Sequence, residues 1–416
     1  AKMILQTVLN DCHKYEGFTY RKIEFDRKEK ELRIRISSDN RFRPRCNQCQ
    51  KPSPGYDRQK ERTFLFVPLW GYKVKLLYAP RRVECREHGV VTEYMPWALG
   101  KSPVTKAFGI FLAHWAKKLD WKDVSKTFCV SWDAVFSAVQ YVVGYGLKHR
   151  VLQGIKHLGL DEIYFKKMKY VTLIYDITEG QKRLLWLGRE RKVLTLMKGL
   201  RKIGLRNLRE VVAVSMDMWA AYAKVITKKL PQALIILDRF HIMKKFNEAI
   251  DQVRRQEVLS LKEKGAGQVL HNSRWCFLKR PENMTEKQEQ RLQELTKQNL
   301  KTYKSYLLRE SFQKFWLYVS VDLAKKFLAD WTFGAMRSKI EPIKKVAKML
   351  RNHEKNILNW FELSPRISNG VVEGFNNKAK TVIRQHYGFR TFSVLELALY
   401  HTMGKLPEPK LTHSFV

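Results

Sequence analysis

The sequence lacks the acidic residues that would balance its basic ones. Of 416 residues, 79 are Lys or Arg and only 40 are Asp or Glu, which leaves a formal net charge of +39 at pH 7. A charge of this size repels itself unless a polyanion neutralises it. The chain has neither a basic amphipathic terminus nor a lipidation motif that would favour a membrane surface. The deficit of acids therefore predicts nucleic acid as the partner.

Long apolar runs and a cysteine framework are also missing. No run approaches the ~20 apolar residues of a membrane-spanning helix, since the longest candidate, 134–147, is interrupted by Gln140 and Gly144. The first residues carry no apolar segment typical of a secretion signal. Six cysteines in a chain of this length are too few for a disulfide scaffold. With 44% hydrophobic residues, we expect a globular cytoplasmic protein of two to four domains.

Three of the cysteines and one histidine have the spacing of metal ligands. Cys46-x2-Cys49 is followed, after 35 residues, by Cys85-x2-His88. Two such knuckles, each offering two soft ligands on a tight turn, complete one tetrahedral zinc site. Because all four positions are filled, we expect a structural zinc ion. Residues 1–100 are therefore predicted to form a β-rich, zinc-binding DNA-binding domain.

Residues 101–150 show the pattern of a helix-turn-helix. A helix over 121–128 with Asp120 as its N-cap is followed by a three-residue turn, and Ser131 caps a second helix. In a protein this basic we favour DNA binding, although a plain helical hairpin has the same pattern. The candidate DNA contacts of these two domains are Arg81, Arg82, Asp133, Ser137 and Gln140. A zinc ribbon that does not bind DNA could carry the same basic residues, so Arg81 and Arg82 do not distinguish the two interpretations.

Residues 151–263 read as alternating strands and helices with acids near strand ends. The expected strands are 157–165, 170–176, 183–188, 211–219 and 233–238, with helices over 193–203 and 220–229. The order β-β-β-α-β-α-β is that of a ribonuclease H-like α/β core. In such a sheet the first and fourth strands are neighbours, which would bring Asp161 and Asp217 side by side. Two adjacent carboxylates repel each other unless a cation separates them.

A third carboxylate lies on a polar helix face near the C-terminal end. Read as a helix, 368–384 gathers polar residues on one face and Val371, Phe375 and Val382 on the opposite face. The polar face holds Asn369, Glu373, Asn376, Asn377, Lys380 and Arg384. Its only acid, Glu373, suits a divalent metal with phosphate nearby, although an ordinary surface helix is the alternative. Three carboxylates can hold two Mg²⁺ ions ~3.5–4 Å apart.

Other acids compete for this role. Glu162 directly follows Asp161 but points to the opposite face of the strand. Asp176 ends the second strand and is also explained as a turn residue. Asp238 begins an Asp-Arg-Phe-His run, in which His241 could donate a ring N–H to a scissile phosphate. A histidine with satisfied hydrogen bonds at a helix start explains His241 as well.

Residues 264–365 are periodic and predict an all-helical insertion that separates Asp217 from Glu373. One basic stripe is expected within 337–355, formed by Lys344, Lys348, Arg351 and Lys355. A solvated helix face normally mixes both signs of charge, so we expect these residues to contact the DNA backbone. Residues 366–416 would then complete the ribonuclease H-like core with the Glu373 helix and a helix over 390–403.

In this order, the motifs resemble the DDE-type transposases of bacterial insertion sequences, and the closest match is the ISL-type group with an N-terminal zinc finger. Leu160-Asp161-Glu162, Ser215-Met216-Asp217-Met218-Trp219, the Asp-Arg-Phe-His run and Asn369-Gly370-Val371-Val372-Glu373-Gly374-Phe375-Asn376 carry the resemblance. It implies that Asp161, Asp217 and Glu373 are the catalytic triad and hold two Mg²⁺ or Mn²⁺ ions, with His241 near the scissile phosphate. His88, where the simplest fingers have a cysteine, is a departure.

The resemblance also implies partners. The N-terminal domains would bind the double-stranded terminal inverted repeats, and a dimer or larger assembly would hold both ends and the target DNA in a bacterial, nucleoid-associated setting. A catalytically inactive regulator on the same fold and a ribonuclease H-like nuclease or junction resolvase are the alternatives. The presence of all three acids argues against the first, and the sequence-reading N-terminus against the second.

Overall fold

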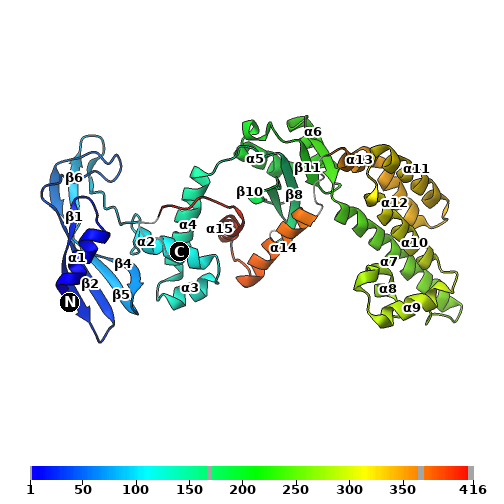
Figure 1. Cartoon of the computed structure of the whole chain (residues 1–416), viewed down its shortest axis with the longest axis horizontal. Coiled ribbons are helices and arrows are strands. Elements are labelled where there is room, and N and C mark those ends of the chain that lie inside the picture. Colours follow the sequence, from blue (N-terminus) through cyan, green and yellow to red (C-terminus); the bar gives the residue numbers. More distant parts are fainter. Residues whose placement is uncertain (1, 166–169, 364–369, 411–416) are drawn as a thin grey trace. The chain divides into compact units, whose positions relative to one another are not determined.

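The computed structural model describes residues 2–165, 170–363 and 370–410. The chain forms two compact units, Ala1–Val151 together with Ala379–Val416, and Leu152–Lys378. Figure 1 shows the course of the chain. Helix α14 (Gly370–Gln385) contributes residues to both units. The boundaries of these two units differ from those of the five expected domains. The expected domain boundaries stay a prediction.

The N-terminal part of the first unit is rich in β-structure and packs around Trp97, which is 1% exposed. Its four-stranded sheet has the order β1-β2-β5-β4, and a second, three-stranded sheet has the order β3-β6-β7. Alternation of apolar and charged residues places Leu32, Ile34 and Ile36 in the core. The elements are α1 (Lys2–Cys12), β1 (Phe18–Asp26), β2 (Glu31–Ser38), β3 (Gly55–Arg58), β4 (Arg62–Leu69), β5 (Tyr72–Tyr78), β6 (Arg81–Cys85) and β7 (Gly89–Thr92).

Helices complete the first unit. They are α2 (Lys106–Ala116), α3 (Trp121–Thr127), α4 (Trp132–His149) and α15 (Phe392–Met403). Both expected N-caps are confirmed: Asp120 Oδ1 accepts from the Lys122 N–H at 2.8 Å, and Ser131 Oγ accepts from the Ala134 N–H at 3.1 Å. Helices α2 and α15 pack against α4. The turn between α3 and α4 is therefore held in a small helical bundle.

A five-stranded mixed sheet forms the centre of the second unit. Its order is β10-β9-β8-β11-β12, with β8 parallel to β11 and antiparallel to β9. This confirms that the first and fourth strands of the expected series are neighbours. The elements are β8 (His157–Tyr164), β9 (Tyr170–Asp176), β10 (Arg183–Arg189), α5 (Val193–Ile203), η2 (Leu205–Leu208), β11 (Ala213–Met216), α6 (Ala220–Lys229) and β12 (Leu234–Leu237).

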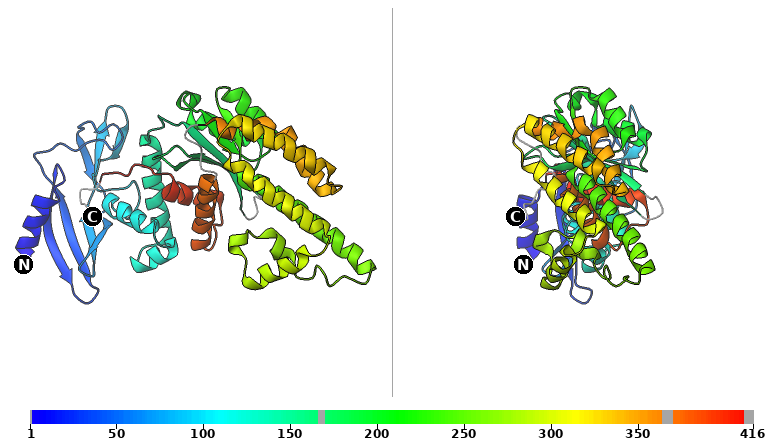
Figure 2. Two further views of the ribbon diagram at one scale, coloured as in Figure 1. Left: turned by 45° about the vertical axis from the view of Figure 1, so that its right-hand side comes forward. Right: turned by 90° about the vertical axis from the view of Figure 1, so that its right-hand side faces the viewer.

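Residues 239–362 of the second unit are mainly helical, which is the character expected for residues 264–365. The 25-residue helix α7 packs along α10 and α12, and Figure 2 gives two further views of the helices of this region. The helices are α7 (Arg239–Glu263), α8 (Arg274–Leu278), η3 (Pro281–Asn283), α9 (Glu286–Thr296), α10 (Lys301–Gln313), η4 (Lys314–Leu317), α11 (Val321–Arg337), α12 (Glu341–Asn352) and α13 (Glu354–Glu362).

The expected basic stripe needs one correction. Lys344, Lys348 and Arg351 lie on α12, but Lys355 lies on α13. The helix breaks at His353, whose backbone has φ −114° and ψ 13°. The prediction of a single continuous stripe is therefore wrong at its last member.

Candidate active site and metal centre

Asp161 and Asp217 come from the two central parallel strands. The register of β8 with β11 pairs Gly159 with Ser215. Two residues further along, Asp161 lies within β8, and Asp217 directly follows β11. Asp161 and Asp217 therefore lie at equivalent positions along two neighbouring strands, which are about 4.8 Å apart in a sheet.

Helix α14 packs on the same part of the sheet. A Cβ atom on Gly159 would lie 2.7 Å from Cγ2 of Val372, so the close approach of helix and strand requires glycine there. The Phe375 ring stacks on that of Tyr175 with centroids 4.7 Å apart. The buried side of α14 includes Val372 rather than the expected Val371, which is only half-buried. Glu373, next in the chain to Val372, is half-buried in the first turn of this helix.

Asn376 joins α14 to Asp161. Its amide Nδ2 donates to Asp161 Oδ2, and its Oδ1 accepts a hydrogen bond of 3.0 Å from the hydroxyl of Tyr175. Asn376 is only 6% exposed, and Tyr175 is fully buried. A buried amide with both ends bonded fixes the orientation of its partners. Asn376 therefore positions Asp161 and the helix of Glu373 together.

The acids are surrounded by donors in a poorly solvated environment. Asp161 Oδ1 accepts from the Glu162 backbone N–H at 2.7 Å, and Asp217 Oδ1 accepts from that of Met218. Burial raises the pKa of Asp161 above its usual value, although these hydrogen bonds oppose the shift. A buried carboxylate with a raised pKa gains from a nearby cation. The burial of Asp161 therefore favours a cation beside its carboxylate.

Sequence reasoning missed Arg191. Its Nη2 donates to Asp217 Oδ2 at 3.0 Å, its Nε lies 3.3 Å from Glu162 Oε1, and its guanidinium lies 4.7 Å from the Trp219 ring centroid. Burial raises the pKa of Glu162 to about 7, although Arg191 draws it down. Glu162 and Asp217 thus share Arg191 as their cationic partner. Arg191 is one cation among 79, so spacing alone could not single it out.

His241 lies in the first turn of α7, and Asp238 caps that helix. Asp238 Oδ1 accepts from the Phe240 N–H at 2.8 Å, and its Oδ2 lies 3.4 Å from His241 Nδ1. Burial alone would lower the pKa of His241, but Asp238, Asp217 and Asp161 together raise it. The charges that act on His241 are therefore those of the two candidate metal ligands and its own N-cap.

Metal-ligating atoms converge closely at one place among the described residues. Cys46, Cys49, Cys85 and His88 each place one ligand atom within 4.8 Å of the other three. The carboxylates of Asp161, Asp217 and Glu373 do not meet at that distance in the part of the chain that the structure describes. The soft cluster is thus already assembled, whereas the ligand atoms of the three acids lie further apart.

The geometry of the soft cluster fits zinc. The Cys49 and Cys85 sulfurs are 3.7 Å apart, and His88 Nδ1 lies 3.8 Å from Cys46 Sγ and 3.6 Å from Cys85 Sγ. A tetrahedron with Zn–S of about 2.3 Å and Zn–N of about 2.0 Å has edges of roughly 3.8 and 3.5 Å. The hydrogen bond with His88 lowers the pKa of Cys85 to about 6, which favours the thiolate that binds metal.

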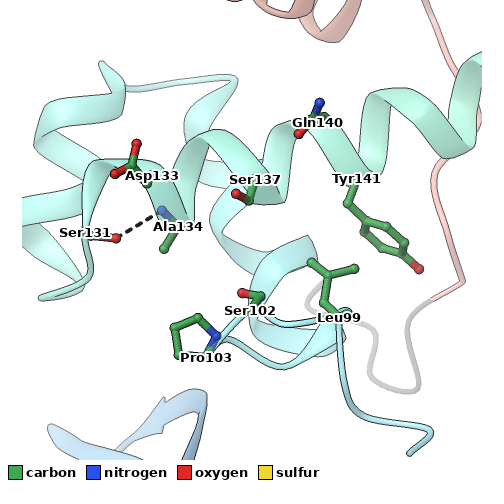
Figure 3. Close-up of a pocket in the computed structure, with 10 residues that line it drawn as sticks. Leu99, Ser102, Pro103, Ser131, Asp133, Ala134, Ser137, Gln140 and Tyr141 are labelled. Carbon is green, nitrogen blue, oxygen red and sulfur yellow. Dashed lines mark hydrogen bonds between the residues drawn. The ribbon is translucent and has the colours of Figure 1, made fainter. Parts of the chain in front are cut away.

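The predicted DNA-contacting residues of α4, Asp133, Ser137 and Gln140, line a cleft of about 460 Å³. Figure 3 shows Asp133, Ser137 and Gln140 along one side of α4, with Ser102 and Pro103 across the cleft. Asp133 and Gln140 are exposed, and Ser137 is half-buried. These three polar side chains thus extend along about two turns of α4.

The other predicted DNA contacts differ in how free their charges are. Arg81 is bound by the buried Glu93 at 2.8 Å, and Arg82 donates to Asp57 at 2.7 Å. Arg351 Nε donates to Thr332 Oγ1 at 3.1 Å. The exposed members of the set are Lys348, Arg351, Lys355, Asn377, Lys380 and Arg384, while Lys344 is half-buried. Asn369 lies outside the described residues.

One structural finding and one comparison with known proteins bear on the class of the chain. In the described part of the chain, no helix is both long and apolar enough to cross a membrane. The model of the ISL3 family of DDE transposases, described as transposase, matches residues 158–399, more than half of the chain.

Individual relatives carry the same description. The chain is 26% identical over 349 residues to the transposase for insertion sequence element IS1001 of Bordetella parapertussis, which covers 83% of this chain and 85% of the relative. It is also 26% identical over 390 residues to the transposase for insertion sequence element IS1557 of Mycobacterium tuberculosis, covering 87% and 86%. The matches span the sheet, the insertion and α14. The chain therefore belongs to the ISL3 family of DDE transposases.

Proposed function

We propose that this transposase cuts the ends of an insertion sequence and joins them to target DNA at a site formed by Asp161, Asp217 and Glu373. One observation carries the proposal: α14 lies against β8, the neighbour of β11 in the sheet, and its Asn376 donates a hydrogen bond to Asp161 of β8. The sheet order, three antiparallel strands followed by two parallel ones, supports assigning this core to the ribonuclease H-like class.

The donor set fits divalent metal. Carboxylate oxygens are the ligands that Mg²⁺ and Mn²⁺ prefer, and the raised pKa of Asp161, caused by burial, favours a cation beside it. Two such ions, when bound, supply activation of a water or 3′-hydroxyl and stabilisation of the leaving oxygen. Asp161, Asp217 and Glu373 would hold them. The ligand atoms of the three carboxylates do not all lie within 4.8 Å of one another, so the carboxylates would have to move closer to share metal ions.

His241 would act on the phosphate rather than on metal. Although burial opposes it, Asp238, Asp217 and Asp161 raise the pKa of His241, which favours the protonated imidazolium. A protonated ring donates hydrogen bonds to a phosphate oxygen. Asp238, as N-cap of α7 and neighbour of Nδ1, would orient the ring.

The first unit would recognise the DNA ends. The zinc cluster would stabilise the small β3-β6-β7 sheet, and α4 would offer Asp133, Ser137 and Gln140 to the major groove. A net charge of +39 supplies phosphate affinity. Both ends of an element must be held together, so we expect a homodimer or a larger assembly on double-stranded DNA in the bacterial nucleoid.

Asp217→Asn tests this function. The variant and the wild-type chain are incubated with labelled duplexes of the element's ends, in Mg²⁺ or in EDTA. We expect cleavage to fall at least about 10³-fold, the scale on which loss of an essential catalytic group acts, while affinity for the ends changes little. Cleavage by Asp217→Asn at the wild-type rate would overturn the assignment. Wild-type binding without Mg²⁺-dependent cleavage would instead indicate an inactive, DNA-binding regulator.

A further inference from the structure

Arg191 is held in place by its backbone neighbours. It lies in the short connection between β10 and α5, directly after Glu190, which has a φ of 67°. The Glu190 N–H donates to the Tyr170 carbonyl at 2.9 Å, and the Glu190 carbonyl accepts from Thr172 Oγ1 at 2.8 Å. These bonds fix the point from which the Arg191 side chain leaves the sheet.

The donors to the two acids are not equivalent. Asp161 receives the Glu162 N–H and the Asn376 amide, and Asp217 receives the Met218 N–H and Arg191. The two backbone donors adjoin their acceptors in the chain and cannot leave. Asn376 is buried and bonded at both ends. Arg191 is the one charged donor of the four, and its side chain is 33% exposed.

Arg191 also has a second carboxylate, that of Glu162, within reach of its guanidinium. Its Nε is buried and has no hydrogen-bond partner among the described residues, although Glu162 Oε1 lies 3.3 Å away. The side chain therefore spans two carboxylates without satisfying all of its donors. If the bond to Asp217 broke, a small rotation would let the guanidinium bond Glu162 fully while the Trp219 ring still covered it.

We propose that Arg191 is an internal counter-ion that neutralises Asp217 before metal binds, is displaced from Asp217 by the divalent cation, and then contacts a DNA phosphate. The inference rests on the proposed function of Asp217. A guanidinium 3.0 Å from Asp217 Oδ2 opposes a second cation at the same oxygen. After displacement, Glu162 and Trp219 keep the positive charge at the edge of the site, where phosphate recognition by arginine is favourable.

Metal titration of the full chain tests this, with Mn²⁺ as the probe and no DNA present. Arg191→Gln should bind Mn²⁺ at least about fivefold more tightly than wild type, and Mn²⁺ should raise its melting temperature by more. Lys192→Gln is the matched control: it removes the same charge from the next residue, which is exposed and paired with Glu190. It should leave Mn²⁺ affinity within about twofold of wild type, as expected for a screened surface charge.

The outcomes separate the two claims. Equal or weaker Mn²⁺ binding by Arg191→Gln would overturn the counter-ion role, because a permanent structural ion pair predicts that result. Arg191→Lys keeps one charge but loses the planar fork, so it should tighten Mn²⁺ binding by an intermediate amount, which keeps the test valid if Arg191→Gln folds poorly. If Asp217→Asn binds Mn²⁺ as well as wild type does, the proposed function fails independently of Arg191.

A different region supports a second inference. The two-residue turn between β4 and β5 consists of Trp70 and Gly71, with φ of 50° and 78°. Such turns favour Asn-Gly or Asp-Gly, and a bulky residue at positive φ is strained. Trp70 is nevertheless 79% exposed, so it gains little from packing. A strained and exposed tryptophan points to a role outside the fold.

The surroundings of Trp70 are basic. Lys73 pairs with Glu31 in the sheet, and its N–H donates to the Lys30 carbonyl at 2.9 Å, so the β1–β2 turn lies beside β5. This end of the sheet exposes Arg27, Lys28, Lys30 and Lys73, with Glu29 as an exposed acid among them. Cations around an exposed aromatic ring fit a nucleic-acid backbone and base.

We infer that this hairpin tip contacts duplex DNA, with Trp70 inserted against a base step; like the first inference, it rests on the proposed DNA-binding function. Trp70→Gly should leave the melting temperature unchanged or higher, because glycine suits the turn, while affinity for the element's end duplex falls about tenfold. Trp275→Ala, which removes a 52% exposed tryptophan from α8 in the other unit, is the control. Unchanged DNA affinity in Trp70→Gly would overturn the inference, whereas absent binding by wild type would overturn the DNA-binding function itself.

Discussion

The protein contains two clusters of potential metal ligands that are built in opposite ways. One cluster is closed and consists of Cys46, Cys49, Cys85 and His88. Its ligand atoms lie 3.6 to 3.8 Å apart in the pairs Cys46–His88, Cys49–Cys85 and Cys85–His88. Asp161, Asp217 and Glu373 come from two strands and a helix and do not form such a set. In the open site, Arg191 and Asn376 occupy carboxylate oxygens instead. A closed site suits a structural ion, and an open one suits ions that come and go with DNA.

The largest effect is expected from a substitution in the closed cluster of Cys46, Cys49, Cys85 and His88. Cys49→Ser removes one of four ligands, and because a structural zinc site contributes roughly 10–16 kcal/mol to folding of a small module, we expect zinc content to fall from about one per chain to near zero. Rapid proteolysis within residues 44–93 should accompany the loss. Zinc analysis and limited proteolysis measure both. Cys129→Ser, at an exposed cysteine outside the cluster, is the control, and equal zinc in both variants would contradict the assignment.

The second prediction separates the two sites. Glu373→Gln should reduce cleavage of end duplexes about 10³-fold, since it removes a charged ligand, while zinc content and affinity for the ends stay as in wild type. If the two sites are independent, damage to the site of the three acids leaves the zinc cluster intact. Retained cleavage would exclude Glu373 as the third ligand, and loss of zinc would show that the sites are not independent.

The third prediction concerns the positioning of Asp161. Asn376→Leu leaves the hydroxyl of Tyr175 and Oδ2 of Asp161 without the partners they have now. We expect a loss of about 1–3 kcal/mol in the free energy of unfolding and a 10–100-fold weaker Mn²⁺ affinity, the scale of groups that orient metal ligands. Tyr175→Phe, which keeps the bond to Asp161, should affect stability alone. Equal Mn²⁺ affinity in wild type and Asn376→Leu would contradict the positioning role.

The smallest effect is a pH dependence. Burial raises the folded-state pKa of Glu162 to about 7, whereas the unfolded chain titrates near 4.5, so ionisation of Glu162 destabilises the fold increasingly as pH rises from about 4.5 to 7 and constantly above that. Glu162→Gln should therefore gain about 1–3 kcal/mol relative to metal-free wild type between pH 5 and pH 8. Urea unfolding at both pH values measures this. A pH-independent difference would show that Glu162 is not desolvated.

Much of the fold could be predicted because its signals are local. Spacing alone identified the knuckles of Cys46 and Cys85, and the caps Asp120 and Ser131 were confirmed by their hydrogen bonds. The order of strands and helices indicated a ribonuclease H-like core, in which the first and fourth strands are neighbours, and β8 and β11 are neighbours in the sheet. The helical character of residues 264–363 followed from periodicity.

The rest depends on contacts between distant segments. Asn376 meets partners that precede it by 201 and 215 residues, and no local pattern names them. Arg191 and Glu162 are charged residues on a highly charged chain, and only tertiary packing brings both to Asp217. The break at His353 was missed because the apolar period continues across it, which moved Lys355 to another helix.

The most direct test of the metal site is cleavage of the protein's own backbone by bound iron. Fe²⁺ replaces Mg²⁺ at carboxylate sites, and with ascorbate and peroxide it cuts the main chain nearby. In the zinc-loaded protein bound to its end duplex, we expect cuts around residues 161, 217 and 373 that excess Mg²⁺ suppresses. The absence of Mg²⁺-sensitive cuts at any one of these three segments would contradict it.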